Sequence, residues 1–242
     1  MKIDIDNLKK SFGDKVAVDI PHATINGGEI LGLVGNNGAG KTTLFRLMLD
    51  LLKADTGTIM LTPDGDATVC QSINPALSEE WKSMTGAYID SGFLIDFLTP
   101  EEYFEFVGKV SGMSADETKE RLDGFAIFMD GEILGQKKYI RDFSAGNQQK
   151  IGIVAALLTR PQLVVLDEPF NFLDPSSQNH LKKILTEYNR STGATILVSS
   201  HNLQHTVEIS TRVALLEHGQ LIKSIDNIDG KAEAELEEYF SV

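Results

Sequence analysis

Short runs of apolar residues recur along the chain and predict buried strands. The clearest runs, 30–34 and 163–166, are continuous rather than alternating. Continuous runs are typical of parallel strands that helices cover on both faces of a sheet. The same texture, in shorter or less regular form, returns at 3–5, 195–199, 213–216 and 221–222. The pattern therefore predicts an α/β fold.

Helical patterns lie between these runs. Apolar residues at three-and-four spacing predict a helix over 43–52. Helical signals then dominate the segment 91–152, where Thr99 and Ser114 each stand three residues before a glutamate in a helix-start pattern. We expect these helices to form a subdomain inserted into the sheet-containing core. An acidic amphipathic helix is expected over 229–242.

Composition narrows the class of protein. With 242 residues, of which 42% are hydrophobic and 24% charged, the chain has the make-up of a soluble globular protein. Its longest apolar run, 151–158, is far shorter than the roughly 20 residues that span a bilayer. A formal net charge of −13 weighs against a broad nucleic-acid-binding surface, so no nucleic-acid partner is expected. The single cysteine, Cys70, cannot form an internal disulfide, and the first residues lack a secretory signal, which favours the cytoplasm.

Residues 35–42 match the phosphate-binding loop pattern G-x-x-x-x-G-K-[ST] at every position. The nucleotide-binding residues expected from this pattern are Gly35, Asn36, Asn37, Gly38, Ala39, Gly40, Lys41, Thr42 and, at the start of the helix behind it, Thr43. The glycines let successive N–H groups curl around phosphate oxygens, and the N-terminal end of the helix faces the same phosphates. Lys41 would reach the β- and γ-phosphates, and the Thr42 hydroxyl would ligate Mg²⁺. We therefore expect a nucleoside triphosphate with Mg²⁺.

Two adjacent carboxylates follow the 163–166 run. Asp167 and Glu168 would stand at the C-terminal end of a buried strand, where sites in open α/β sheets lie. We expect Asp167 to hold Mg²⁺. Glu168 would then be free to polarise a water molecule in line with the γ-phosphate, as a catalytic base.

With four further segments, the chain resembles the ATP-binding-cassette (ABC) ATPase family over essentially its whole length. Residues 143–150 are similar to the family signature L-S-G-G-Q and the helix after it, 170–174 to the D-loop and 198–201 to the histidine switch. Phe12 occupies the position of the aromatic residue that stacks on adenine. The resemblance implies a P-loop NTPase (RecA-like) core with an N-terminal antiparallel β subdomain and an inserted helical subdomain. One ABC ATPase domain would fill 1–242, with the nucleotide-binding core at 1–90 and 153–242 and the helical subdomain at 91–152.

The resemblance also implies a head-to-tail dimer that encloses two ATP molecules. Ser144 suits the N-cap of a helix that begins near Asn147, and its hydroxyl with the Gly146 N–H would make an anion site. In the family this site meets the γ-phosphate held by the P-loop of a second subunit. His201 would contact the same phosphate in a catalytic role, and Asp174 would bridge the subunits. Two intact half-sites favour a homodimer.

The chain departs from the family pattern at a few positions. Ala145 replaces the first glycine of the signature, a change that requires no unusual backbone. The glutamine of the family's Q-loop, which touches Mg²⁺, aligns best with Asp90, whose carboxylate could also ligate the metal. Gln71 remains the alternative at this position.

The leading functional interpretation is the ATP-hydrolysing subunit of an ABC transporter, similar to single-cassette subunits of exporters. A separate membrane-embedded permease would dock on the apolar segment 91–98, which places the chain on the cytoplasmic face of the inner (plasma) membrane. The alternative is a soluble ABC ATPase without a transport role, for example of the iron–sulfur assembly type. The transported substance cannot be predicted from this sequence, because in this family the membrane subunit selects it.

Overall fold

The computed structural model describes residues 1–65, 71–227, 232–233 and 235–236. Cys70 and most of the helix expected over 229–242 lie outside the described residues. None of the described helices is both long and apolar enough to cross a lipid bilayer.

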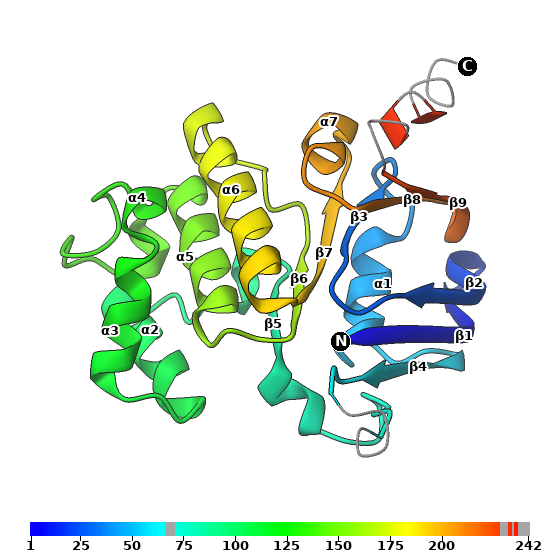
Figure 1. Cartoon of the computed structure of the whole chain (residues 1–242), viewed down its shortest axis with the longest axis horizontal. Coiled ribbons are helices and arrows are strands. Elements are labelled where there is room, and N and C mark those ends of the chain that lie inside the picture. Colours follow the sequence, from blue (N-terminus) through cyan, green and yellow to red (C-terminus); the bar gives the residue numbers. More distant parts are fainter. Residues whose placement is uncertain (66–70, 228–231, 234, 237–242) are drawn as a thin grey trace.

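Two sheets form the framework, and they confirm the α/β class (Figure 1). The smaller sheet is antiparallel, in the order β2-β1-β4, with β1 at Lys2–Phe12, β2 at Lys15–Ile25 and β4 at Thr56–Thr62. The larger sheet has the order β5-β6-β7-β3-β8-β9 and is parallel except for β9. Its strands are β3 (Ile30–Val34), β5 (Thr85–Tyr88), β6 (Leu163–Leu166), β7 (Thr195–Ser200), β8 (Arg212–Glu217) and β9 (Gln220–Asp226).

Most of the helices lie in the segment that connects β5 to its neighbouring strand β6. The helices are α1 (Lys41–Met48), α2 (Pro100–Val110), α3 (Ala115–Asp123), α4 (Ala126–Met129), α5 (Ala145–Leu158), α6 (Pro175–Thr192) and α7 (Leu203–Val207). Short 3₁₀ turns lie at Glu80–Met84, Ser91–Phe93 and Ile140–Asp142. Helices α2, α3 and α4 lie at the opposite end of the molecule from the small antiparallel sheet (Figure 1).

The helix starts follow from local capping. Thr99 and Ser114 each form a reciprocal capping box with the glutamate three residues later, which confirms both predicted starts. Ser144 caps α5, as expected, although the helix begins at Ala145 rather than near Asn147. Helix α1 ends at Met48, short of the predicted residue 52, and Leu51 beyond it is half-exposed. Helix α5 continues to Leu158 and so crosses the subdomain boundary placed at residue 152.

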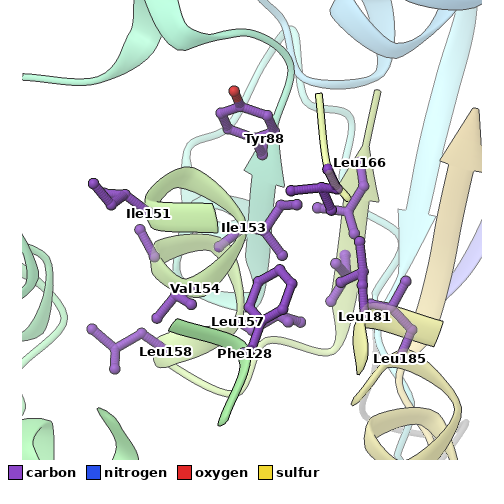
Figure 2. Packing of buried hydrophobic residues seen from close by; sticks show 14 of the residues in the cluster. Tyr88, Phe128, Ile151, Ile153, Val154, Leu157, Leu158, Leu166, Leu181 and Leu185 are labelled. Atoms are coloured by element: carbon purple, nitrogen blue, oxygen red, sulfur yellow. The ribbon is translucent and has the colours of Figure 1, made fainter. Parts of the chain in front are cut away.

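Among the described residues, two large clusters form the main halves of the core, one on each face of the large sheet, and a smaller third cluster joins β3, β8 and α7. Leu163 and Val165 pack in a cluster with α1 and the small sheet, whereas Val164 and Leu166 pack with α5 and α6. Figure 2 shows the second half, with Leu181 and Leu185 of α6 beside Leu166. Burial on both faces explains the continuous apolar runs of β3 and β6. Strand β7 lies between these two strands, so their C-terminal ends meet at one edge of the sheet.

Candidate active site

The P-loop joins β3 to α1 and packs closely against neighbouring backbone. At Gly35 a Cβ atom would lie 2.2 Å from the Leu216 carbonyl oxygen, and at Gly40 it would lie 2.3 Å from that of Ala17. Gly40 also has a φ of +112°, in the region that favours glycine. These contacts explain why glycine is required at both positions and hold the loop in a fixed shape at the start of α1.

Lys41 is the first residue of α1 and is almost fully buried, with 6% of its surface exposed. Its Nζ donates to the Gly35 carbonyl at 2.6 Å and to the Asn36 carbonyl at 3.4 Å. It also lies 3.2 Å from Glu168 Oε1. The lysine predicted to bind phosphate and the glutamate predicted to activate water therefore contact each other directly.

Asp167 lies beside Thr42, so the structure brings together two of the predicted metal ligands. The Thr42 hydroxyl donates to one carboxylate oxygen of Asp167, and the Ser199 hydroxyl donates to the other. Burial raises the pKa of Asp167 above its ordinary value, and hydrogen bonds from Ser199 and Thr42 act in the opposite direction.

This donor set fits Mg²⁺ bound together with phosphate. Mg²⁺ prefers oxygen ligands and commonly takes only one or two carboxylates alongside substrate phosphates. The Thr42 hydroxyl and the Asp167 carboxylate already converge on each other. Within the described part of the chain, no group of three or more His, Cys, Asp or Glu side chains is placed to hold a metal ion. The metal would therefore share its ligands between the protein and the phosphate oxygens of the substrate.

Glu168 adopts a left-handed backbone conformation, with a φ of +46°. Its N–H donates to Ser199 Oγ at 2.8 Å. Its carboxylate Oε2 lies 2.8 Å from His201 Nδ1 and accepts from the His201 N–H at 3.3 Å. The predicted catalytic pair, Glu168 and His201, thus meets at the ends of β6 and β7, next to Lys41.

The signature segment starts α5 and contacts the D-loop. The Ser144 side chain accepts from the Asn147 N–H at 3.3 Å, which closes the N-terminal turn. A Cβ atom at Gly146 would lie 2.6 Å from the Phe172 carbonyl, so glycine is needed where α5 meets residues 170–174. Among the described residues, no hydrogen bond joins Ser144 or Gly146 to the P-loop of the same chain.

Asp174 and Phe12 lie in clear local settings. Asp174 is the N-cap of α6 and accepts from the Ser176 N–H, the Ser177 N–H and the Ser177 hydroxyl. These bonds, with the Ser177 hydroxyl first, lower the pKa of Asp174 to about 2. Phe12 ends β1 with 53% of its surface exposed, so its ring is accessible for stacking.

Asp90 contacts other groups than the predicted Mg²⁺ ligands. One carboxylate oxygen accepts from Arg46 Nη2 at 3.1 Å, and the other accepts from the Gly92 N–H at 2.8 Å. Gln71, the alternative, is exposed. The role of either residue at the metal therefore stays a prediction.

Sequence reasoning missed three residues that contact this site. Ser199 holds both Asp167 and the Glu168 backbone, and Gln149 and Tyr88 form a buried chain to the Glu168 carbonyl. Ser199 stands in the 198–201 segment two residues before His201, so its position at the end of a strand was the available signal. No pattern in the sequence indicates the contact between Tyr88 and Gln149, because it depends on tertiary packing.

Comparisons with known proteins agree with this geometry. The family model described as "ABC transporter" matches residues 18–171. The bacitracin transport ATP-binding protein of Enterococcus faecalis is 29% identical over 93% of this chain and 69% of its own length. The Nod factor export ATP-binding protein I of Sinorhizobium fredii is 33% identical over 98% of this chain and 64% of its own length.

A solved dimeric bacterial ABC transporter cassette has the same fold. It superposes with a TM-score of 0.80 at 21% sequence identity, over 93% of this chain and 99% of the cassette. The matching family model covers the P-loop, the signature segment and the paired carboxylates of this chain. The chain therefore belongs to the ABC transporter family and is an ATP-binding, ATP-hydrolysing subunit of that family.

Proposed function

We propose that this chain hydrolyses Mg²⁺-ATP in a head-to-tail homodimer and transmits closure of the dimer to a separate permease, in the manner of an exporter. The observation that carries the proposal is the convergence of Lys41, Asp167, Glu168 and His201 at one sheet edge. The names of the relatives, which refer to bacitracin transport and Nod factor export, support a role in transport. They do not favour the alternative of an iron–sulfur assembly ATPase.

ATP would lie along the P-loop. Backbone N–H groups of residues 35–43 would surround the phosphates, and Lys41 would pair with the β- and γ-phosphates. The exposed ring of Phe12 would stack on the adenine. Thr42 and Asp167, and Asp90 if it leaves Arg46, would hold Mg²⁺, which neutralises charge that develops on the phosphates.

Glu168 would act as the general base. Its carboxylate lies between Lys41 and His201, which holds it next to the expected position of the γ-phosphate. From there it can accept a proton from a water molecule that attacks the γ-phosphorus in line, while ADP leaves. His201 orients the carboxylate and would itself contact the γ-phosphate.

A second chain would complete the site: Gly146 of the signature segment packs against the D-loop, and among the described residues no hydrogen bond joins Ser144 or Gly146 to the P-loop of the same chain. In a head-to-tail dimer, Ser144 and Gly146 of one copy would complete the γ-phosphate site of the other. Asp174, the last residue of the D-loop and the N-cap of α6, would lie at the contact between the copies. ATP would then bridge the two chains, and hydrolysis would release them.

An apolar pocket offers a surface for the permease. The pocket has a volume of about 270 Å³ and lies between the turn that follows α1, β5 and the segment after β5, with Leu51, Trp81, Tyr88 and Phe93 in its wall. Phe93 and Phe97 expose 53% and 62% of their surfaces to solvent. An apolar helix end from a membrane protein would cover these rings, so the chain would work on the cytoplasmic face of the inner membrane.

The Glu168→Gln variant tests the catalytic proposal. It removes the base but keeps the Asp167 metal site, so we expect ATP affinity to be retained and turnover to fall by about 10²-fold or more. Steady-state phosphate release and nucleotide titration measure the two quantities. As a control, Lys41→Ala should abolish tight ATP binding. Near-native turnover in Glu168→Gln would remove Glu168 from its assigned role.

A second measurement tests the permease. The tagged protein is extracted from its native cells with mild detergent, and copurifying proteins are identified by mass spectrometry. We expect a polytopic membrane protein in comparable amount, and we expect Phe93→Asp to lose it because a charge would enter the apolar contact. Copurification of soluble proteins alone, with the chain absent from membranes, would contradict the proposal.

A further inference from the structure

A buried hydrogen-bonded chain leads from β5 through α5 to the backbone of Glu168. The Tyr88 hydroxyl donates to Gln149 Oε1 at 3.3 Å, and Gln149 Nε2 donates to the Glu168 carbonyl at 3.0 Å. Tyr88 and Gln149 each expose only 5% of their surface. Neither residue belongs to the nucleotide-contacting set proposed above.

The direction of the chain is fixed by chemistry. The Glu168 carbonyl oxygen can only accept a hydrogen bond, so the amide nitrogen of Gln149 must face it. The amide oxygen then faces Tyr88, and the phenol hydroxyl donates to it.

The peptide that receives this hydrogen bond is conformationally unusual. Glu168 has a φ of +46°, which a residue with a side chain adopts only where its surroundings hold it. The Ser199 hydroxyl fixes its N–H, while Gln149 and the Asn171 N–H, at 3.1 Å, fix its carbonyl. Rotation of this backbone would carry the carboxylate away from His201 and Lys41.

The chain is held by direct packing of α5 on β5. A Cβ atom at Gly152 would lie 2.2 Å from two ring carbons of Tyr88, and at Gly86 it would lie 1.8 Å from the Ala156 carbonyl. The Tyr88 ring therefore lies directly against α5, as Figure 2 shows. This close packing fixes the position of α5 relative to β5 and so holds the Gln149 amide near the Glu168 carbonyl.

We propose that Gln149, oriented by Tyr88, is a positioning residue for ATP hydrolysis: its amide holds the Glu168 backbone in the conformation that directs the carboxylate to the reaction. This inference rests on the proposed catalytic role of Glu168. It predicts that loss of the amide affects the hydrolytic step and leaves nucleotide binding unchanged, because the Gln149 side chain hydrogen-bonds to the Tyr88 hydroxyl and to the Glu168 carbonyl.

The test is Gln149→Met, which keeps the length of the side chain but removes its donor and acceptor. We expect kcat to fall about tenfold or more while the dissociation constant for ATP stays within about twofold of the native value. Tyr88→Phe removes only the hydroxyl and should lower kcat less, with no further loss when combined with Gln149→Met. Tyr188→Phe is the matched control, because it deletes a half-buried hydroxyl that donates to the Pro161 carbonyl, away from the site, and should leave kcat unchanged.

The outcomes separate this inference from the function on which it rests. An inactive Glu168→Gln together with native kcat in Gln149→Met would overturn the positioning role and leave the base in place. Parallel loss of kcat, ATP affinity and melting temperature in Gln149→Met would also overturn it, because that pattern describes general damage. An active Glu168→Gln would overturn both. If Gln149→Met does not fold, Tyr88→Phe decides the question, and native kcat in that variant rejects the inference.

Discussion

Two aspartates near the end of β6 show how neighbours set the chemistry of one residue type. Burial raises the pKa of Asp167, whereas hydrogen bonds from Ser177 and Ser176 lower that of Asp174. A metal ion bound to Asp167 would offset the free-energy penalty of burying its charged carboxylate. Asp174, in contrast, is fully ionised at neutral pH and caps α6. The sequence predicted both residues as functional. The sequence did not predict that the Asp174 carboxylate would accept hydrogen bonds at the start of α6, because this depends on the backbone path of residues 170–177.

The metal role of Asp90 gives a prediction at this scale. If Asp90 ligates Mg²⁺, Asp90→Asn removes a charge from the metal site and should raise the Mg²⁺ concentration for half-maximal ATPase activity by about threefold to tenfold. Gln71→Ala, at the alternative position, should leave that concentration unchanged. Titration of ATPase activity with Mg²⁺, from a chelator-treated preparation, measures both.

Arg46→Met serves as a second control for Asp90. This variant removes the 3.1 Å ion pair with Asp90 but keeps the carboxylate, so the Mg²⁺ requirement should stay the same or fall. A larger effect of Gln71→Ala than of Asp90→Asn would assign the Q-loop role to Gln71 instead.

At the scale of elements, the strands buried on both faces were predicted, whereas the half-buried strands were predicted only in part: residues 3–5 of β1 and 221–222 of β9 gave a signal, but β2, β4 and β5 did not. Strands β3, β6 and β7 are continuous apolar runs, buried along their length, and the sequence indicated all three. Strands β2 and β4 carry polar residues on an exposed face, and β5 contains Thr85, Gly86 and Ala87, so none has a strong apolar signal. Strand β5 packs closely against α5, and Gly86 and Gly152 lie at this contact, where a side chain would keep the two elements apart.

The contact between β5 and α5 yields a stability prediction. Gly152→Ala places a methyl group 2.2 Å from the Tyr88 ring in a buried site, so the free energy of unfolding should fall by about 1–3 kcal/mol. Urea unfolding monitored by circular dichroism measures this change. In a Tyr88→Leu background, where the ring is absent, the same substitution should cost much less. An equal cost in both backgrounds would show that the ring is not the source of the clash.

For the whole molecule, the sequence predicted the family and the order of its parts, and the resemblance to the family implied that a second copy completes each site. The P-loop, the paired carboxylates and His201 meet within the chain, as the motif spacing and the parallel order of β3, β7 and β6 require. The signature segment instead contacts residues 170–174 at the start of α5. The signature segment is expected to bind the γ-phosphate held by a second copy. This binding requires the dimer and cannot be derived from the local sequence pattern alone.

The central claim is that each ATP lies between the P-loop of one copy and the signature of the other. The direct measurement mixes two inactive variants, Lys41→Ala and Ser144→Arg, and follows ATP-dependent association and phosphate release. In a mixed head-to-tail dimer one interface carries both substitutions and the other carries neither. We therefore expect activity that neither variant shows alone, whereas no recovery at any mixing ratio would contradict a site shared between two chains.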